Sequence, residues 1–268
     1  MIVDALTPDI HVLVGETYQS NSTVFLNGKE ALLVEGMASR GDAANLRKFV
    51  ETELKKQVRF IICTHYFSDH LAALKLFPEA QIIAHKNYIH TFASENHRSP
   101  EEEDHFVEPD ILISDGMTMK WGRNTLDIFY NPGHTMSTLG IDVPEADLLI
   151  AGDTIVGNMV YLSYSAPEMF YPALGRLRRR GRSRLLTSHL GVRTSDAIDN
   201  AFFYLDSLRG KVAAARQSSG NGDSIREIEL DSCLPDGVKG TGFENIFHKR
   251  NLESIIERRL FGQVGHEN

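Results

Sequence analysis

Four short segments of the chain carry histidine or aspartate directly after apolar runs that have the length of β-strands. They cover residues 64–70, 132–135, 151–154 and 188–191. Imidazole nitrogens and carboxylate oxygens are ligands that Zn²⁺, Fe²⁺ and Mn²⁺ accept. Strand ends can aim polar side chains at one point, so the segments together predict a metal site. One such histidine alone would more often be a hydrogen-bonded structural residue.

At these residues the chain resembles the metallo-β-lactamase superfamily. That family carries His-x-His-x-Asp-His, then Gly-His, Gly-Asp and a late Gly/Ser-His, and the order and spacing agree over roughly residues 10–191. The resemblance implies an α/β fold, namely a four-layer αββα sandwich with its metal cleft at one edge between the two sheets.

The resemblance further implies six ligands for two metal sites. They are His65 and His134 in the first site, Asp69, His70 and His189 in the second, and Asp153 as the bridge. The chain departs from the family at Phe67, where the second histidine of the first site is expected, and a phenyl ring has no lone pair for a metal. A lesser departure is Glu35-Gly36, in a place where Asp-x-Gly is common.

Three metal occupancies are compatible with this ligand set: one ion in the second site, two ions with the first bound weakly, or one ion in the first site alone. Ligand count and negative charge favour the second site. The first two occupancies predict a hydrolase in which a metal-bound hydroxide, formed because the metal lowers the pKa of its bound water to about 7, attacks an ester, thioester, lactone or amide-like substrate. We expect zinc, as one or two ions, with Fe²⁺ or Mn²⁺ as alternatives. Asp69 and His65 are the expected catalytic residues, and Asp69 could instead act as a general base.

The third occupancy indicates a different reaction. Two histidines and one carboxylate, here His65, His134 and Asp153, form the facial pattern of non-haem iron oxygenases, and the chain is similar there to the persulfide dioxygenases of the same superfamily. A mononuclear iron dioxygenase is therefore the first alternative. The second is a catalytically impaired member that binds a ligand, although six retained ligand-type residues speak against it.

Aromatic and histidine side chains near the motifs provide further candidates. Phe67, Tyr161 and Tyr164 are expected to form an aromatic wall for substrate. One of four histidines between the first and second motifs could replace the missing ligand, although surface or supporting roles are commoner. These are His85, His90, His97 and His105.

The elements that position these residues alternate between short apolar runs and amphipathic stretches. Strands are expected at 10–14, 22–26, 31–34, 58–63, 81–84, 111–113, 117–119, 126–130, 139–143, 148–150 and 185–187. Helices are expected at 42–55, 69–78, 86–94, 169–179, 197–218 and 245–260. This order fits helices outside packed sheets. We expect a metallo-β-lactamase-like domain at 1–218 and a C-terminal helical extension at 219–268, which either caps the cleft or makes a homodimer contact.

Composition limits the partners. The 268 residues carry a net charge of −8, which argues against general nucleic-acid binding. Six arginines in 176–184 are better explained by a cation-stabilised helix end than by a phosphate patch. The two cysteines form no C-x-x-C pair, and no signal peptide or apolar stretch of about 20 residues is evident. A cytoplasmic protein with a small-molecule substrate and no membrane partner is expected.

Overall fold

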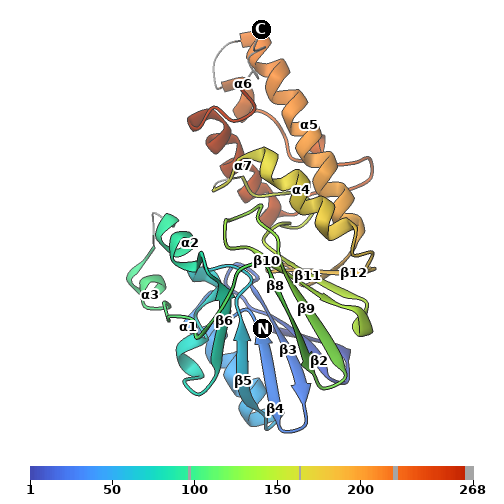
Figure 1. Cartoon of the computed structure of the whole chain (residues 1–268). Coiled ribbons are helices and arrows are strands. Elements are labelled where there is room, and N and C mark those ends of the chain that lie inside the picture. The colour runs from blue at the N-terminus through green and yellow to red at the C-terminus, as the bar shows by residue number, and fades with distance from the viewer. Residues whose placement is uncertain (96–97, 163, 220–222, 263–268) are drawn as a thin grey trace.

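Two β-sheets stacked face to face form the centre of the molecule, with helices on their outer sides (Figure 1). The computed structural model describes residues 1–95, 98–162, 164–219 and 223–262. The first sheet has seven strands that neighbour each other in sequence order. They are β1 (Ile2–Thr7), β2 (Ile10–Val14), β3 (Asn21–Asn27), β4 (Glu30–Val34), β5 (Gln57–Ile62), β6 (Gln81–His85) and β7 (Ile111–Ile113).

The second sheet has six strands in the order β13-β12-β11-β10-β9-β8. They are β8 (Gly116–Trp121), β9 (Asn124–Tyr130), β10 (Leu139–Val143), β11 (Leu148–Gly152), β12 (Arg184–Thr187) and β13 (Val192–Thr194). Parallel pairing of β4 to β7 and of β11 with β12 brings the carboxyl ends of neighbouring strands together. Loops that follow these strands can therefore share one site.

An apolar layer joins the inner faces of the two sheets. Phe25 and Leu32 of the first sheet and Ile128 and Ile141 of the second are fully buried within this cluster. Trp121 crosses the layer, because its indole N–H donates to the carbonyl of Phe25 at 2.9 Å. Burial of this area stabilises the sandwich by about 25 cal/mol per Å² of apolar surface.

Helices cover both outer faces. On the side of the first sheet lie α1 (Arg40–Arg47), a π-helix (Lys48–Glu53), α2 (Tyr88–Ser94) and α3 (Pro100–Glu103). Beside the second sheet lie α4 (Pro167–Arg178), α5 (Asp196–Ser219), α6 (Asp223–Arg226) and α7 (Gly242–Glu257), which gather at the top of Figure 1. The expected four-layer αββα fold with additional C-terminal helices is confirmed. The division of the chain after residue 218 stays a prediction.

The expected helix at 69–78 is wrong. Two short 3₁₀ turns, Ser68–His70 and Leu74–Leu76, stand there. The backbone N–H of Ala73 donates to the carbonyl of Gly36 at 2.7 Å, and that of Ala72 donates to Met37 at 3.2 Å. These bonds to residues far away in the sequence use N–H donors that an α-helix would need for its own hydrogen bonds. The edge strands β1 and β13 were not predicted either, because β1 is largely exposed and β13 has only three residues.

The arginine-rich segment is tied into the fold. Arg178 pairs with Asp199, Arg180 with Asp127, and Arg182 with Asp142 at 2.7 Å. Arg176 donates to the side-chain oxygen of Asn131 at 2.8 Å and to the carbonyl of Pro132 at 2.9 Å. These contacts give four of the six arginines a structural role, and Arg176 contacts the loop that carries His134. Among the described residues, no helix is both long and apolar enough to cross a membrane.

Candidate metal centre

The four motif segments meet at one end of the sandwich because each follows or lies between strands that finish there. His65 follows β5, His134 lies between β9 and β10, Asp153 follows β11, and His189 follows β12. Gly152 adopts a φ of +57°, and a Cβ there would lie 2.7 Å from the Thr64 hydroxyl oxygen. Glycine therefore allows the Asp153 and His65 segments to approach closely.

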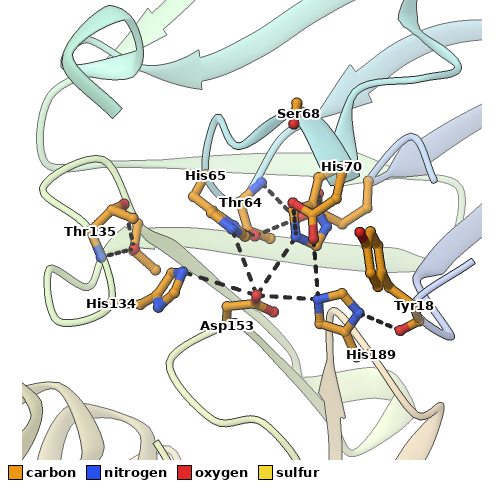
Figure 2. A network of polar contacts seen from close by, with 12 residues as sticks. Tyr18, Thr64, His65, Ser68, His70, His134, Thr135, Asp153 and His189 are labelled. Carbon is orange, nitrogen blue, oxygen red and sulfur yellow. Dashed lines mark hydrogen bonds and ion pairs between the residues drawn. The ribbon is translucent and has the colours of Figure 1, made fainter. Parts of the chain in front are cut away.

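Asp153 lies at the meeting point of four histidines (Figure 2). Its Oδ2 is 3.3 Å from Nε2 of His189 and 3.7 Å from Nε2 of His70. The same oxygen is 3.9 Å from Nε2 of His65 and 4.0 Å from Nε2 of His134. A carboxylate in this position can contact ions on either side of it.

Two clusters of ligand-type atoms surround this carboxylate. His65, His134 and Asp153 form one, and Asp69, His70 and His189 form the other. Within each cluster the candidate ligand atoms lie within 4.8 Å of one another. Asp69 connects the members of the second, with one carboxylate oxygen 3.3 Å from Nε2 of His70 and the other 3.7 Å from Nε2 of His189. The structure thus brings together all six residues that the sequence proposed as ligands.

Several atoms of the centre are buried and have no hydrogen-bond partner among the described residues. They are Nε2 of His65, both ring nitrogens of His70 and of His134, Oδ1 of Asp153 and Oε2 of Glu35. Buried polar atoms in proteins are almost always paired, because an unpaired one costs about 1–3 kcal/mol. Lone pairs of nitrogen and oxygen that converge in this way fit one or two divalent cations with tetrahedral or octahedral N/O preference.

Hydrogen bonds behind the histidines orient their rings. Nδ1 of His189 lies 2.8 Å from the carbonyl oxygen of Tyr18, which can only accept, so Nδ1 carries the proton and Nε2 offers its lone pair to the centre. Nδ1 of His65 lies 3.1 Å from the hydroxyl of Thr64. Burial lowers the pKa of both His65 and His134. Both rings are therefore neutral and able to bind a metal near pH 7.

For Asp153 and His70, neighbouring charges outweigh the effect of burial on the pKa. Although burial alone would raise the pKa of Asp153, His189 and His70 hold it well below its usual range. Burial would lower the pKa of His70, but Asp69 and Glu35 raise it to about 10. With its pKa raised to about 10, His70 carries a second ring proton near pH 7. A metal would displace that proton.

Glu35, which was not among the residues expected from the sequence to form the site, is a member of the centre. Its Oε2 lies 3.5 Å from Nδ1 of His70, and its Oε1 accepts from the backbone N–H of Thr64 at 2.9 Å and from the Thr64 hydroxyl. Burial raises its pKa to about 7. Its φ of 71° is unusual for a non-glycine residue and costs about 1–3 kcal/mol. The only signal in the sequence was the departure at Glu35-Gly36.

Phe67 lies beside the first cluster. Its ring centre is 5.3 Å from that of His65 and 5.4 Å from that of His134, and its side chain is buried. It also contacts Tyr164, at 4.4 Å between ring centres. An apolar ring therefore occupies the border of the first cluster and faces the cleft.

The other histidines do not supply a replacement ligand within the described part of the chain. His85 bonds to the Ser114 carbonyl at 3.0 Å and to the N–H of Asn87 at 3.1 Å. His105 bonds to the Ser68 carbonyl at 2.9 Å, and His90 is exposed on α2. None of these three belongs to a metal-capable cluster. His97 lies outside the described residues.

The centre opens into a cleft of about 540 Å³. Phe67, Tyr161 and Tyr164, the three residues expected to contact substrate, all line it. Asp69, His134, Asp153 and His189 form part of its floor. Phe247, Arg250 and Glu257 of α7 also line it, so the C-terminal extension borders the cleft, which is one of the two placements expected for it. The sequence did not indicate which of its side chains face the cleft.

Solved structures of other proteins share this fold. A metallo-beta-lactamase family protein from Thermus thermophilus superposes with a TM-score of 0.70 at 17% identity, over 95% of this chain and 94% of that one. A stereoselective inverting sec-alkylsulfatase from a Pseudomonas species gives 0.72 at 12% identity, over 98% of this chain and 51% of that one. These likenesses show the fold. The model of the metallo-beta-lactamase superfamily matches residues 15–197, and the chain belongs to that superfamily.

Curated relatives are distant and carry different activities. A metallo-beta-lactamase type 2 of Bacillus cereus is 25% identical over 139 residues, 52% of each chain. The atrochrysone carboxyl ACP thioesterase of Aspergillus fumigatus is 24% identical over 166 residues, 58% of this chain and 48% of that one. A hydroxyacylglutathione hydrolase of Francisella tularensis subsp. novicida is 26% identical over 105 residues, 38% of this chain and 35% of that one. The chain spans about half or less of these relatives.

Proposed function

We propose that the protein is a metal-dependent hydrolase acting on an ester, thioester, lactone or amide-like substrate. The observation that carries the proposal is Asp153 Oδ2, which lies 3.3 to 4.0 Å from the Nε2 atoms of four histidines, between two clusters able to hold an ion. The relatives named as β-lactamase, thioesterase and hydroxyacylglutathione hydrolase support a hydrolytic reaction.

The second cluster is the stronger candidate for a tightly held ion. Asp69, His70 and His189 with Asp153 offer four ligands, two of them carboxylates. The first cluster has His65 and His134 with the shared Asp153, and Phe67 takes the border where a further ligand would stand. Zinc fits this set of nitrogen and oxygen donors, and Fe²⁺ or Mn²⁺ are alternatives. When bound, the ion would lower the pKa of a water to about 7 and polarise the substrate oxygen.

The exposure of Asp69 and the orientation of His65 support catalytic roles for both residues. Asp69 is the more open carboxylate of the centre, with 23% of its side chain exposed against 8% for Asp153. It can hold a proton taken from a water that enters from the cleft. His65, oriented by the Thr64 hydroxyl, presents Nε2 toward Asp153. We assign Asp69 and His65 to catalysis on this geometry.

The aromatic wall would hold the apolar part of the substrate. Tyr161 lies with its ring nearly parallel to that of His134, at 6.1 Å between centres, and Tyr164 packs on Phe67. Rings on one side of a cleft bury apolar groups while the opposite side stays polar. A substrate that places its scissile bond over Asp153 would pass along these rings.

An iron dioxygenase is the second candidate. The cluster of His65, His134 and Asp153 supplies the two-histidine, one-carboxylate set that such enzymes use. Under this alternative the intact cluster of Asp69, His70 and His189 would have no role, which is why hydrolysis is preferred.

Metal identity and stoichiometry test the proposal. Protein purified without added metal or chelator would be analysed for its elements and then assayed on thioesters, lactones, esters and β-lactams. About one or two zinc per chain with hydrolysis is the expected result. About one iron per chain with oxygen uptake on a persulfide would support the dioxygenase instead. A chain that holds no metal, even after titration, would overturn both.

A further inference from the structure

Helix α7 forms one wall of the cleft, although it lies beyond the residues matched to the superfamily model. Phe243 lies 5.5 Å from His189, and Phe247 lies 4.9 Å from Tyr161, both between ring centres. Arg250, one turn further along the same helix, also lines the cleft. The C-terminal helix therefore meets whatever part of the substrate extends beyond the metal centre.

Buried polar side chains fix this helix against the loop that follows Asp153. The fully buried Glu244 accepts from the backbone N–H of Asn158 at 2.6 Å. Asn251 accepts from the N–H of Leu162 at 2.7 Å and donates to the carbonyl of Val160 at 2.7 Å. Because these bonds bracket Tyr161, they set the position of α7 relative to the aromatic wall.

A second hollow, of about 500 Å³, lies next to the cleft. It shares Tyr161 and Arg250 with the cleft, so the two spaces adjoin at these side chains. Its remaining lining comes from α6 and α7: Arg226, Lys249, Leu252, Glu253 and Ser254. A substrate longer than the cleft can therefore reach past Tyr161 into this hollow.

The hollow is basic. Three cations, Arg226, Lys249 and Arg250, line it against the single carboxylate of Glu253. Glu253 is already paired with Arg226, at 2.9 and 3.0 Å. In the parts of the chain that the structure describes, Lys249 and Arg250 form no ion pair, and Arg250 lies over the ring of Phe247 at 5.1 Å. Two charges are thus left for a ligand.

The cleft itself has the opposite balance. It is lined by the carboxylates of Glu95, Glu102 and Glu257 in addition to those of the metal centre. Glu95 accepts from the N–H and hydroxyl of Ser68, and Glu102 accepts from the N–H of Ser99 at 2.7 Å. An anionic group of the substrate would be repelled from these acids and attracted to the hollow.

We propose that the hollow between α6 and α7 binds an anionic group, a carboxylate or a phosphate, on the part of the substrate remote from the scissile bond. The inference rests on the proposed hydrolase function and narrows its substrate class. Arg250 receives the group at the boundary of the two spaces, since a guanidinium offers paired N–H donors to carboxylate or phosphate oxygens. Lys249 adds a second charge.

Calorimetric titration of the metal-loaded protein with three thiols tests this. N-acetylcysteamine is neutral, glutathione carries carboxylates and coenzyme A carries phosphates, while all three offer the same metal-seeking sulfur. We expect at least one charged thiol to bind about tenfold more tightly than the neutral one at low salt. Preference for glutathione alone would identify the group as a carboxylate, and preference for coenzyme A alone would identify it as a phosphate.

Variants separate the hollow from the metal centre. The double variant Lys249→Gln/Arg250→Gln should remove most of the preference while its metal content stays unchanged. Lys29→Gln, in the exposed turn between β3 and β4, is the control for loss of charge and should keep the preference. Equal affinities for the three thiols in a metal-bound protein, or a preference that survives the double variant, would overturn this inference alone. A protein without metal would overturn the proposed function, and this inference with it.

Discussion

Nδ1 of His70 lies 3.5 Å from Oε2 of Glu35, so a buried carboxylate stands behind a ligand-type histidine. The other oxygen of Glu35 accepts from Thr64, whose hydroxyl lies 3.1 Å from Nδ1 of His65. One side chain therefore supports a histidine in each cluster. Such supporting carboxylates orient the ring and make its metal-binding nitrogen more basic.

Replacing Glu35 by glutamine should weaken metal binding by about 10- to 100-fold, because the amide presents a donor toward His70. Chelator competition would measure the dissociation constant. Glu35→Asp, which keeps the charge, should recover part of the affinity. Glu53→Gln, an exposed change at the end of the π-helix, should leave it unchanged. An unaltered constant in Glu35→Gln would show that Glu35 has no part in metal binding.

Replacing Phe67 by histidine should raise the metal content. The Phe67 ring lies 5.3 and 5.4 Å from the rings of His65 and His134, so an imidazole there would border the first cluster. We expect the content to rise from about one ion per chain toward about two. Elemental analysis after dialysis measures it, and Phe67→Leu is the control that removes the ring without adding a ligand. No gain in Phe67→His would mean that something else blocks the first cluster.

Single alanine variants of the two clusters should have unequal effects. His70→Ala removes a nitrogen near both Asp69 and Asp153, so most of the metal should be lost if the second cluster holds the ion. His65→Ala should leave most metal bound and reduce activity only if the first cluster takes part in the reaction. His90→Ala, on the exposed face of α2, should change neither. Full metal content in His70→Ala would contradict tight binding at the second cluster.

The sequence predicted most of the fold because each strand-forming run is short, apolar and bounded by turns. The four segments that carry the six ligand-type residues could be found because each comes after a predicted strand, and the resemblance to the metallo-β-lactamase superfamily then implied which six residues are ligands. The turns at Ser68–His70 and Leu74–Leu76 could not be predicted, since Ala72 and Ala73 between them donate their N–H groups to Met37 and Gly36, more than thirty residues earlier. Pairings of that range leave no periodic pattern.

Glu35 and helix α7 show that contacts between distant residues also limited the prediction of the site. Glu35 directly follows the buried strand β4, and nothing local reveals that its carboxylate reaches His70. The apolar pattern of residues 245–260 predicted a helix, but two of the residues that fix α7 are the buried polar side chains Glu244 and Asn251. The apolar pattern of a helix does not predict which of its polar residues are buried.

His248 gives a prediction far from the metal ligands, where α5 and α7 meet. Its Nε2 lies 2.9 Å from the carbonyl of Ile228, which can only accept, so Nε2 carries the proton. Its Nδ1 then accepts from the hydroxyl of Tyr204 at 2.9 Å, while that hydroxyl accepts from Asn251 at 2.9 Å. The folded protein thus uses a neutral His248 ring, and burial lowers its pKa below 6.5.

Because the unfolded chain takes up this proton at higher pH than the folded one, His248 makes the folded state less stable as pH falls below 6.5. Above that value both states are neutral and the contribution is complete. The free energy of unfolding of the natural protein, relative to His248→Gln, should therefore decrease between pH 7.5 and 5.5, by at most about 1.4 kcal/mol per pH unit. Urea titrations at matched metal content measure it. A difference that stays constant with pH would mean that His248 carries its proton equally in both states.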